Sequence, residues 1–164
     1  MDSFGPLPAS QLGNKYVLVV IDTFSRYVEL YGLATNSQAY LANIIHHQLV
    51  PQHGLPMESL SDNGSPFASD FITTLASLLD TNTLFAPPSH QQANGFAERF
   101  MGTLRRLIIS YIEQEHIGQQ WDRLLQLFAF AHNTTYLEVI GNTPSFVCHE
   151  RYVSPLDQAF PLWF

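Results

Sequence analysis

Apolar and polar residues alternate along the chain in runs whose spacing predicts both strands and helices. Residues 16–21 (Tyr-Val-Leu-Val-Val-Ile) form a continuous apolar run, typical of a strand that is buried on both faces. Residues 27–33 follow after a short turn and are predicted to form its antiparallel hairpin partner. Shorter strands are predicted at residues 2–4, 58–61 and 82–85, the first of them truncated at its start.

Helical spacing of apolar residues appears in several further segments. Ser37 is predicted to cap the first of these helices, and Thr143-Pro144 to open the last one. Pro87 and Pro88 mark a loop over residues 86–94. The longer helices are predicted at residues 37–52, 69–79, 95 to about 116, and 119–133. This order of strands and helices predicts an α/β domain.

The composition supports one folded domain. The chain has 164 residues, of which 46% are hydrophobic and 13% charged, which excludes a disordered chain. No apolar run approaches the ~18–20 residues that span a bilayer, and no secretory signal opens the sequence. The single Cys148 has no partner for an internal disulfide. We therefore expect an intracellular protein that is neither secreted nor held in a membrane.

Two short motifs carry the candidate chemistry. Asp62 lies in Ser-Asp-Asn-Gly-Ser-Pro-Phe (61–67), and Glu98 lies in Asn-Gly-Phe-Ala-Glu-Arg (94–99), with 35 residues between the two acids. Each acid alone has a structural explanation, as a turn aspartate or as a helix-start glutamate. Together, beside glycines that permit close backbone approach, they predict a site for a divalent metal and a phosphate. A third carboxylate is needed, and the residues alone leave Asp2 and Asp22 open.

These motifs resemble the catalytic core of retroviral and gypsy-type retrotransposon integrases. The resemblance runs from Met-Asp-Ser-Phe-Gly-Pro-Leu-Pro (1–8), through the two acidic motifs, to Ser-Pro-Leu-Asp (154–157). It implies a ribonuclease-H-like fold with a mixed five-stranded sheet and helices on both faces. It also implies a core domain at residues 1–157, followed by a C-terminal tail at residues 158–164.

The resemblance also implies a catalytic and metal-binding triad of Asp2, Asp62 and Glu98. In this family the first aspartate precedes a Gly-Pro-Leu-Pro-like segment, which selects Asp2 over Asp22. Asp22 is then predicted to cap the turn after its strand. The expected cofactors are two Mg²⁺ or Mn²⁺ ions, with Asp2 bridging both.

DNA-binding residues follow from the same resemblance. Arg105 and Arg106 are expected to contact DNA phosphates, and Ser89 and Asn94 belong to the predicted active-site loop. Ser89, Gln91 and Met101 depart from the family pattern at positions usually held by an aromatic residue, a proline and an asparagine. The net charge of −7 opposes DNA binding, although three of the seven basic residues lie within eight residues of Glu98. We therefore expect weak DNA affinity.

The function that the resemblance implies is DNA integration. Such an integrase, a polynucleotidyl transferase with endonuclease-type activity, cuts near the 3′ end of the element's DNA and joins that end to target DNA. The expected partners are both DNAs and further copies of the chain as a homodimer or higher oligomer, without a nucleotide cofactor. The expected location is the nucleus or a virus-like particle.

Two other interpretations stay open. The acidic charge and the altered loop favour a domesticated or decayed integrase that serves as a protein-interaction module. A ribonuclease-H-type nuclease would share the metal chemistry, but the motif around Glu98 favours an integrase. The sequence shows no zinc-binding cluster of two His and two Cys. His46, His47 and His53 are therefore predicted to be surface or packing residues.

Overall fold

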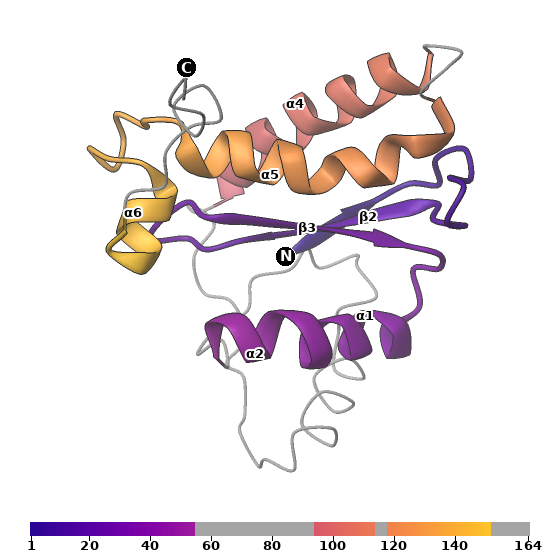
Figure 1. Ribbon diagram of the computed structural model, residues 1–164, viewed down its shortest axis with the longest axis horizontal. Coiled ribbons are helices and arrows are strands. Elements are labelled where there is room, and N and C mark those ends of the chain that lie inside the picture. The colour runs from indigo at the N-terminus through magenta and orange to yellow at the C-terminus, as the bar shows by residue number, and fades with distance from the viewer. Residues whose placement is uncertain (55–93, 114–117, 152–164) are drawn as a thin grey trace, which may run out of the picture.

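The computed structural model describes residues 1–54, 94–113 and 118–151, which form a sheet between two helical layers (Figure 1). The strands are β1 (Asp2–Phe4), β2 (Tyr16–Ile21) and β3 (Val28–Leu33). One face of the sheet carries α1 (Gln38–Ile44), the π-helical turn η1 (Ile45–Leu49) and α2 (Val50–His53). The other face carries α4 (Asn94–Ile112), the 3-10 turn η3 (Gly118–Leu124) and α5 (Leu125–Thr134). The last helix is α6 (Pro144–His149).

The three strands are antiparallel in the order β1-β2-β3. Asp2 pairs with Val19, and Ile21 pairs with Val28. All three agree with the predicted strands to within one residue. The other two predicted strands, at residues 58–61 and 82–85, and the predicted helix at 69–79 lie outside the described residues. The five-stranded sheet therefore stays a prediction, while the α/β class with helices on both faces agrees with the structure.

Strand β2 is buried on both faces, as its apolar run predicts. Leu18 belongs to a cluster with side chains of β3, α1 and η1, whereas its neighbours Val17 and Val19 belong to a second cluster with α4, η3 and α5. All three side chains are at most 1% exposed. Burying one aliphatic side chain contributes roughly 1.5–3 kcal/mol, so this strand anchors both helical layers.

The first helical segment begins where the sequence predicts. The Ser37 side chain accepts a hydrogen bond from the Tyr40 backbone N–H at 3.4 Å. Pro51 has no N–H to donate within the helix, and the π-helical turn η1 comes immediately before this part of the chain. The segment therefore continues to His53, but its hydrogen-bond pattern changes on the way.

The predicted helix at residues 119–133 is not continuous. It starts as the 3-10 turn η3, in which Gln120 has non-helical backbone angles (φ −115°, ψ 15°). Long-range contacts hold this turn, because Trp121 is fully buried and its indole N–H donates to the Pro8 carbonyl at 3.0 Å. Asp122 also accepts hydrogen bonds from the side chains of Ser10 and Asn14. These contacts outweigh helical propensity at the start of the segment.

Two side chains of α5 bind the backbone of β3. The Asn133 amide accepts from the Val28 N–H and donates to the Val28 carbonyl, both at 2.9 Å. The Gln126 amide donates to the Leu30 carbonyl at 2.9 Å. Asn133 is buried, so both of its polar ends need these partners. Helix α5 is thereby fixed to β3 by hydrogen bonds as well as by apolar packing.

The remaining helices agree with their sequence signals. Helix α4 was predicted from residue 95 to about 116 and is observed at Asn94–Ile112. The Thr143 side chain caps α6 by accepting from the Phe146 N–H at 3.3 Å, with Pro144 in the first turn. Among the described helices, none combines the length and apolar character that crossing a membrane requires.

Candidate functional site

Asp2 is the first residue of β1, and its side chain is exposed. Its Oδ1 accepts a hydrogen bond from the neighbouring Ser3 N–H at 2.7 Å. The segment that follows leaves the sheet at Gly5, whose φ is +146°. A Cβ at this glycine would lie 2.5 Å from Tyr16 Cδ1 and 2.6 Å from the Lys15 carbonyl oxygen, so only glycine fits. This close contact with Tyr16 and Lys15 fixes the path of the backbone immediately after β1, the strand that carries Asp2.

Asp2 lies on the face of the sheet that α4 covers. Phe4 packs against the buried cluster that contains Leu104 and Ile108 of α4. Side chains two residues apart on a strand point to the same face, so Asp2 points to the side that Phe4 occupies. Glu98 is exposed on the same helix α4, before the first of these buried positions. Asp2 and the helix that carries Glu98 therefore lie on the same side of the sheet.

Asp22 has a different role, as its turn position predicts. Its Oδ2 accepts from the Ser25 N–H at 2.7 Å and from the Ser25 hydroxyl at 2.5 Å. Its own backbone closes the hairpin, because its N–H donates to the Tyr27 carbonyl and its carbonyl accepts from the Arg26 N–H. Asp2 pairs with Val19, three positions before Asp22, so the two acids are roughly 10 Å apart along the strand direction.

The other predicted site residues are only partly described. Asp62 and Ser89 lie outside the described residues, and Asn94 is the first residue of α4. Arg105 and Arg106 are exposed on α4. Arg105 follows Glu98 by seven positions, which places it about 20° around the helix and about 10 Å along its axis. Arg106 lies about 80° around from Glu98, so Arg105 shares the face of Glu98 more closely.

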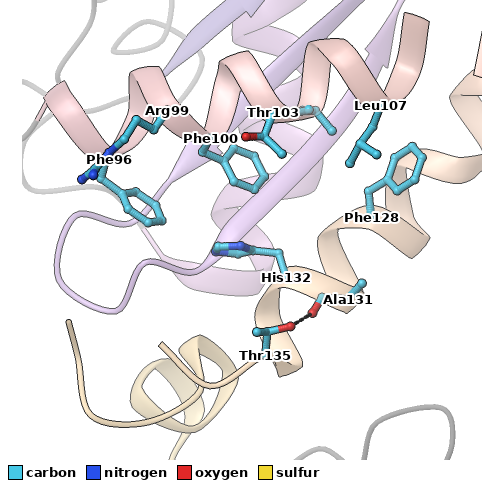
Figure 2. Close-up of a pocket in the computed structure, with 10 residues that line it drawn as sticks. Phe96, Arg99, Phe100, Thr103, Leu107, Phe128, Ala131, His132 and Thr135 are labelled. Carbon is cyan, nitrogen blue, oxygen red and sulfur yellow. Dashed lines mark hydrogen bonds between the residues drawn. The ribbon is translucent and has the colours of Figure 1, made fainter. Parts of the chain in front are cut away.

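Helices α4 and α5 enclose a groove of about 540 Å³ (Figure 2). Most of its lining is apolar, and the Phe100 ring meets the His132 ring edge-on with centroids 4.8 Å apart. The groove is lined by Phe96, Arg99, Phe100, Thr103, Leu104, Leu107, Phe128, Ala131, His132 and Thr135. Phe96 and Phe100 were not predicted to line a groove, although they show the i, i+4 spacing of one helix face.

His132 connects this groove to the turn that Asp22 organises. Its Nε2 lies 3.0 Å from the Arg26 carbonyl oxygen, and the Arg26 guanidinium lies 5.0 Å from the Phe96 ring centroid. Burial lowers the pKa of His132, and the hydrogen bond to Arg26 opposes this shift only in part. The lowered pKa therefore favours the neutral imidazole of His132.

Comparisons with known proteins agree with these motifs. The family model described as "Integrase core domain" matches residues 1–91. The chain is 30% identical over 144 residues to the retrovirus-related Pol polyprotein from transposon 412 of Drosophila melanogaster, covering 88% of this chain and 12% of that protein. It is 30% identical over 169 residues to the Gag-Pol polyprotein of gibbon ape leukemia virus, and the match covers 98% of this chain and 10% of that protein. The chain thus spans about a tenth of the length of these relatives.

Solved structures share the fold. The catalytic core domain of BIV integrase matches with a TM-score of 0.62 at 21% identity, covering 91% of this chain and 92% of that one. A simian T-cell lymphotropic virus intasome, solved in complex with PP2A regulatory subunit B56 gamma, matches with a TM-score of 0.66 at 20% identity. The match covers 98% of this chain and 58% of that one. At these identities the likeness establishes the fold, which is that of integrase catalytic cores.

Proposed function

Because the chain belongs to the integrase core domain family, as its motifs predict, we propose that it performs metal-dependent phosphoryl transfer in DNA integration. The observation that carries the proposal is the placement of Asp2 and Glu98 on the same side of the sheet. Asp22, the competing acid, is held by its own turn. The 35-residue interval between Asp62 and Glu98 supports the same triad.

The donor set fits a hard divalent cation. Asp2 and Glu98 are exposed carboxylates, and carboxylate oxygens are the ligands that Mg²⁺ and Mn²⁺ prefer. Asp2, Asp62 and Glu98 would hold two such ions. Bound there, the ions would supply activation of the attacking hydroxyl and charge stabilisation of the leaving oxygen.

The chain's own residues bind and orient the DNA. Arg105, on the face of α4 nearest to Glu98, is placed to bind a phosphate, and Arg106 provides a second charge beside it. Ser89 and Asn94 are assigned to further DNA contacts. In the first reaction water cleaves a phosphodiester near the 3′ end of the element. In the second, the freed 3′-hydroxyl replaces a 3′-oxygen in the target strand, so one phosphodiester replaces another and no nucleotide cofactor is consumed.

The proposed partners are element DNA, target DNA and further copies of the chain. One structural neighbour is an intasome, which supports DNA binding and assembly as a homodimer or higher oligomer. The net charge of −7 predicts that the chain alone binds DNA weakly. The nucleus or a virus-like particle is the proposed place of action.

A second candidate function is that of a protein-interaction module. The apolar groove between α4 and α5 and the acidic net charge favour it, because both suit a protein partner better than a polyanion. The two candidate functions can be distinguished by measuring catalysis, because only the enzyme uses the carboxylates of Asp2, Asp62 and Glu98 in a reaction.

The test uses a branched DNA that mimics the product of strand transfer. Such a substrate presents its own 3′-hydroxyl, so reversal of strand transfer demands mainly the metal site. We expect the chain with Mn²⁺ to resolve it, and Glu98→Gln to abolish the reaction. Glu113→Gln is the matched control, because Glu113 is an exposed glutamate just after the same helix.

Two outcomes would contradict the enzyme assignment. A folded wild-type chain that binds Mn²⁺ but resolves no branched substrate would favour the interaction module. Activity that persists in Glu98→Gln would exclude Glu98 as a ligand or reveal a contaminating nuclease.

A further inference from the structure

A second group of ligand-type side chains lies away from the carboxylates. It consists of His53, the last residue of α2, and Cys148 and His149 at the end of α6. One ligand atom from each of the three lies within 4.8 Å of the other two. His53 and Cys148 are 95 positions apart in the sequence, so the fold brings them together.

Neighbouring rings contact both histidines of this group. The His53 and His149 rings stack with centroids 5.7 Å apart and planes inclined by 28°. The Tyr27 ring contacts both of them, with its centroid 5.6 Å from that of His53 and 5.0 Å from that of His149. Residue 53 is exposed as a whole, yet its side chain keeps only 22% of its surface accessible. These ring contacts therefore restrict the orientations of both imidazoles.

An acidic group supports His53 from outside the cluster. Glu29 Oε1 lies 3.1 Å from His53 Nε2, and the Glu29 side chain is 13% exposed. A carboxylate that accepts from one ring nitrogen of a histidine fixes its tautomer and makes the other nitrogen a better metal ligand. This is the usual second partner of a metal-bound histidine.

The local electrostatic potential favours a cation. The carboxylates of Asp22 and Glu29 both lie close enough to act electrostatically on Cys148. Their negative charges attract a positive ion. Asp22, Glu29 and the cluster all lie around the β2–β3 hairpin and α6, and α6 adjoins that hairpin in Figure 1.

We propose that His53, Cys148 and His149 bind a Zn²⁺ ion, with a water molecule as the fourth ligand. Two imidazoles and one thiolate are ligands that Zn²⁺ prefers, whereas Mg²⁺ prefers oxygen. In a tetrahedral zinc site, ligand atoms are roughly 3.3–3.6 Å apart. Closing the cluster from at most 4.8 Å requires side-chain shifts of about 1 Å, which leave the backbone in place.

The proposed zinc joins the end of α2 to the end of α6. In the sequence, Asp62 follows His53 by nine positions. This site is separate from the carboxylate site in ligands and in metal type, so each can fail without the other.

The experiment uses Co²⁺ as a spectroscopic substitute for Zn²⁺. After metal is removed with a chelator, Co²⁺ should give a thiolate-to-Co²⁺ charge-transfer band that Zn²⁺ then abolishes by displacement. Zn²⁺ should also raise the Tm of the wild-type chain. Cys148→Ser should lose the band, and both Cys148→Ser and His149→Phe should lose the Tm shift. His149→Phe keeps an aromatic ring beside Tyr27, so it separates ligation from packing.

Asp2→Asn is the matched control for the carboxylate site and should keep both the band and the Zn²⁺-induced Tm shift. Far-ultraviolet circular dichroism of the metal-free variants checks that they fold. Absence of the band in the wild type, or an undiminished Zn²⁺-induced Tm shift in folded Cys148→Ser, would overturn the proposal. Loss of the Tm shift in Asp2→Asn would assign the zinc to the carboxylates instead.

Discussion

Asp2 and Asp22 are the same residue type at the ends of neighbouring strands, yet the fold uses them differently. Asp22 binds the backbone and hydroxyl of Ser25 and thereby closes the turn after β2. Asp2 is exposed at the start of β1, where Oδ1 meets only the N–H of the next residue within the hydrogen bonds described. An aspartate whose oxygens satisfy a turn has little left for a cation, whereas one at an open strand end keeps its oxygens available.

The largest expected difference between the two acids is in catalysis. Asp2→Asn should reduce the resolution of branched DNA by more than about 100-fold, because it removes a charged ligand. Asp22→Asn should stay within a few-fold of the wild type, since an amide oxygen still accepts from Ser25. Single-turnover rates with Mn²⁺ measure both. Equal losses in the two variants would abolish the distinction between them.

The next difference is in stability, where substitution of Asp22 should cost more than substitution of Asp2. Asp22→Ala should lower the free energy of unfolding by about 1–2 kcal/mol, because the Ser25 N–H and hydroxyl lose their acceptor. Asp2→Ala should change it by less than about 0.5 kcal/mol. Urea unfolding in the presence of a chelator removes the metal contribution. A larger cost at Asp2 would show that its carboxylate serves the fold.

A smaller effect is expected in DNA binding on the Asp2 side. Arg105→Ala should weaken binding and reduce the slope of log K against log[salt] by about 1, as loss of one phosphate contact does. Arg106→Ala, at the next exposed position of α4, is the comparison and should have a weaker effect, because Arg106 lies further around the helix from Glu98. Fluorescence anisotropy over a salt series measures both slopes. Identical slopes in Arg105→Ala and the wild type would exclude the contact.

The smallest effect concerns pH on the Asp22 side, through His132 and the Arg26 carbonyl. Burial lowers the pKa of His132 in the folded chain, so the unfolded chain binds more protons as the pH falls below about 6.5. The contribution of His132 to stability is complete above that pH and declines below it, until the folded-state pKa is reached. His132→Gln should therefore lose less stability than the wild type between pH 7.5 and 5.5, measured by Tm. His47→Gln, at an exposed helical position, is the control substitution.

Local sequence signals predicted much of the described fold. The caps at Ser37 and Thr143, the doubly buried β2 and the hairpin with β3 each depend on residues close together in the chain. The 3-10 turn around Trp121 was missed, because its cause is a contact with Pro8, 113 positions away. Periodicity carries no information about such distant partners, so it predicted a continuous helix.

The candidate site was predictable in a similar, partial way. Glu98 and Asp62 stand in recognisable motifs, but the choice of Asp2 over Asp22 required a resemblance, because both acids border predicted strands. The structure adds the hydrogen bonds that occupy Asp22. The group of His53, Cys148 and His149 gave no sequence signal, since its members lie on two elements far apart in the chain.

The hydrogen bonds from α5 to β3 bear on how copies of this chain meet. In the described sheet β3 is an outer strand, and the outward-facing backbone groups of such a strand can pair with a strand of another molecule. Asn133 satisfies both groups of Val28, and Gln126 satisfies the carbonyl of Leu30. Two helix side chains thus occupy bonding positions that an adjacent strand would use at Val28 and at the Leu30 carbonyl. They oppose the pairing of another strand with this part of β3, and with it open-ended aggregation.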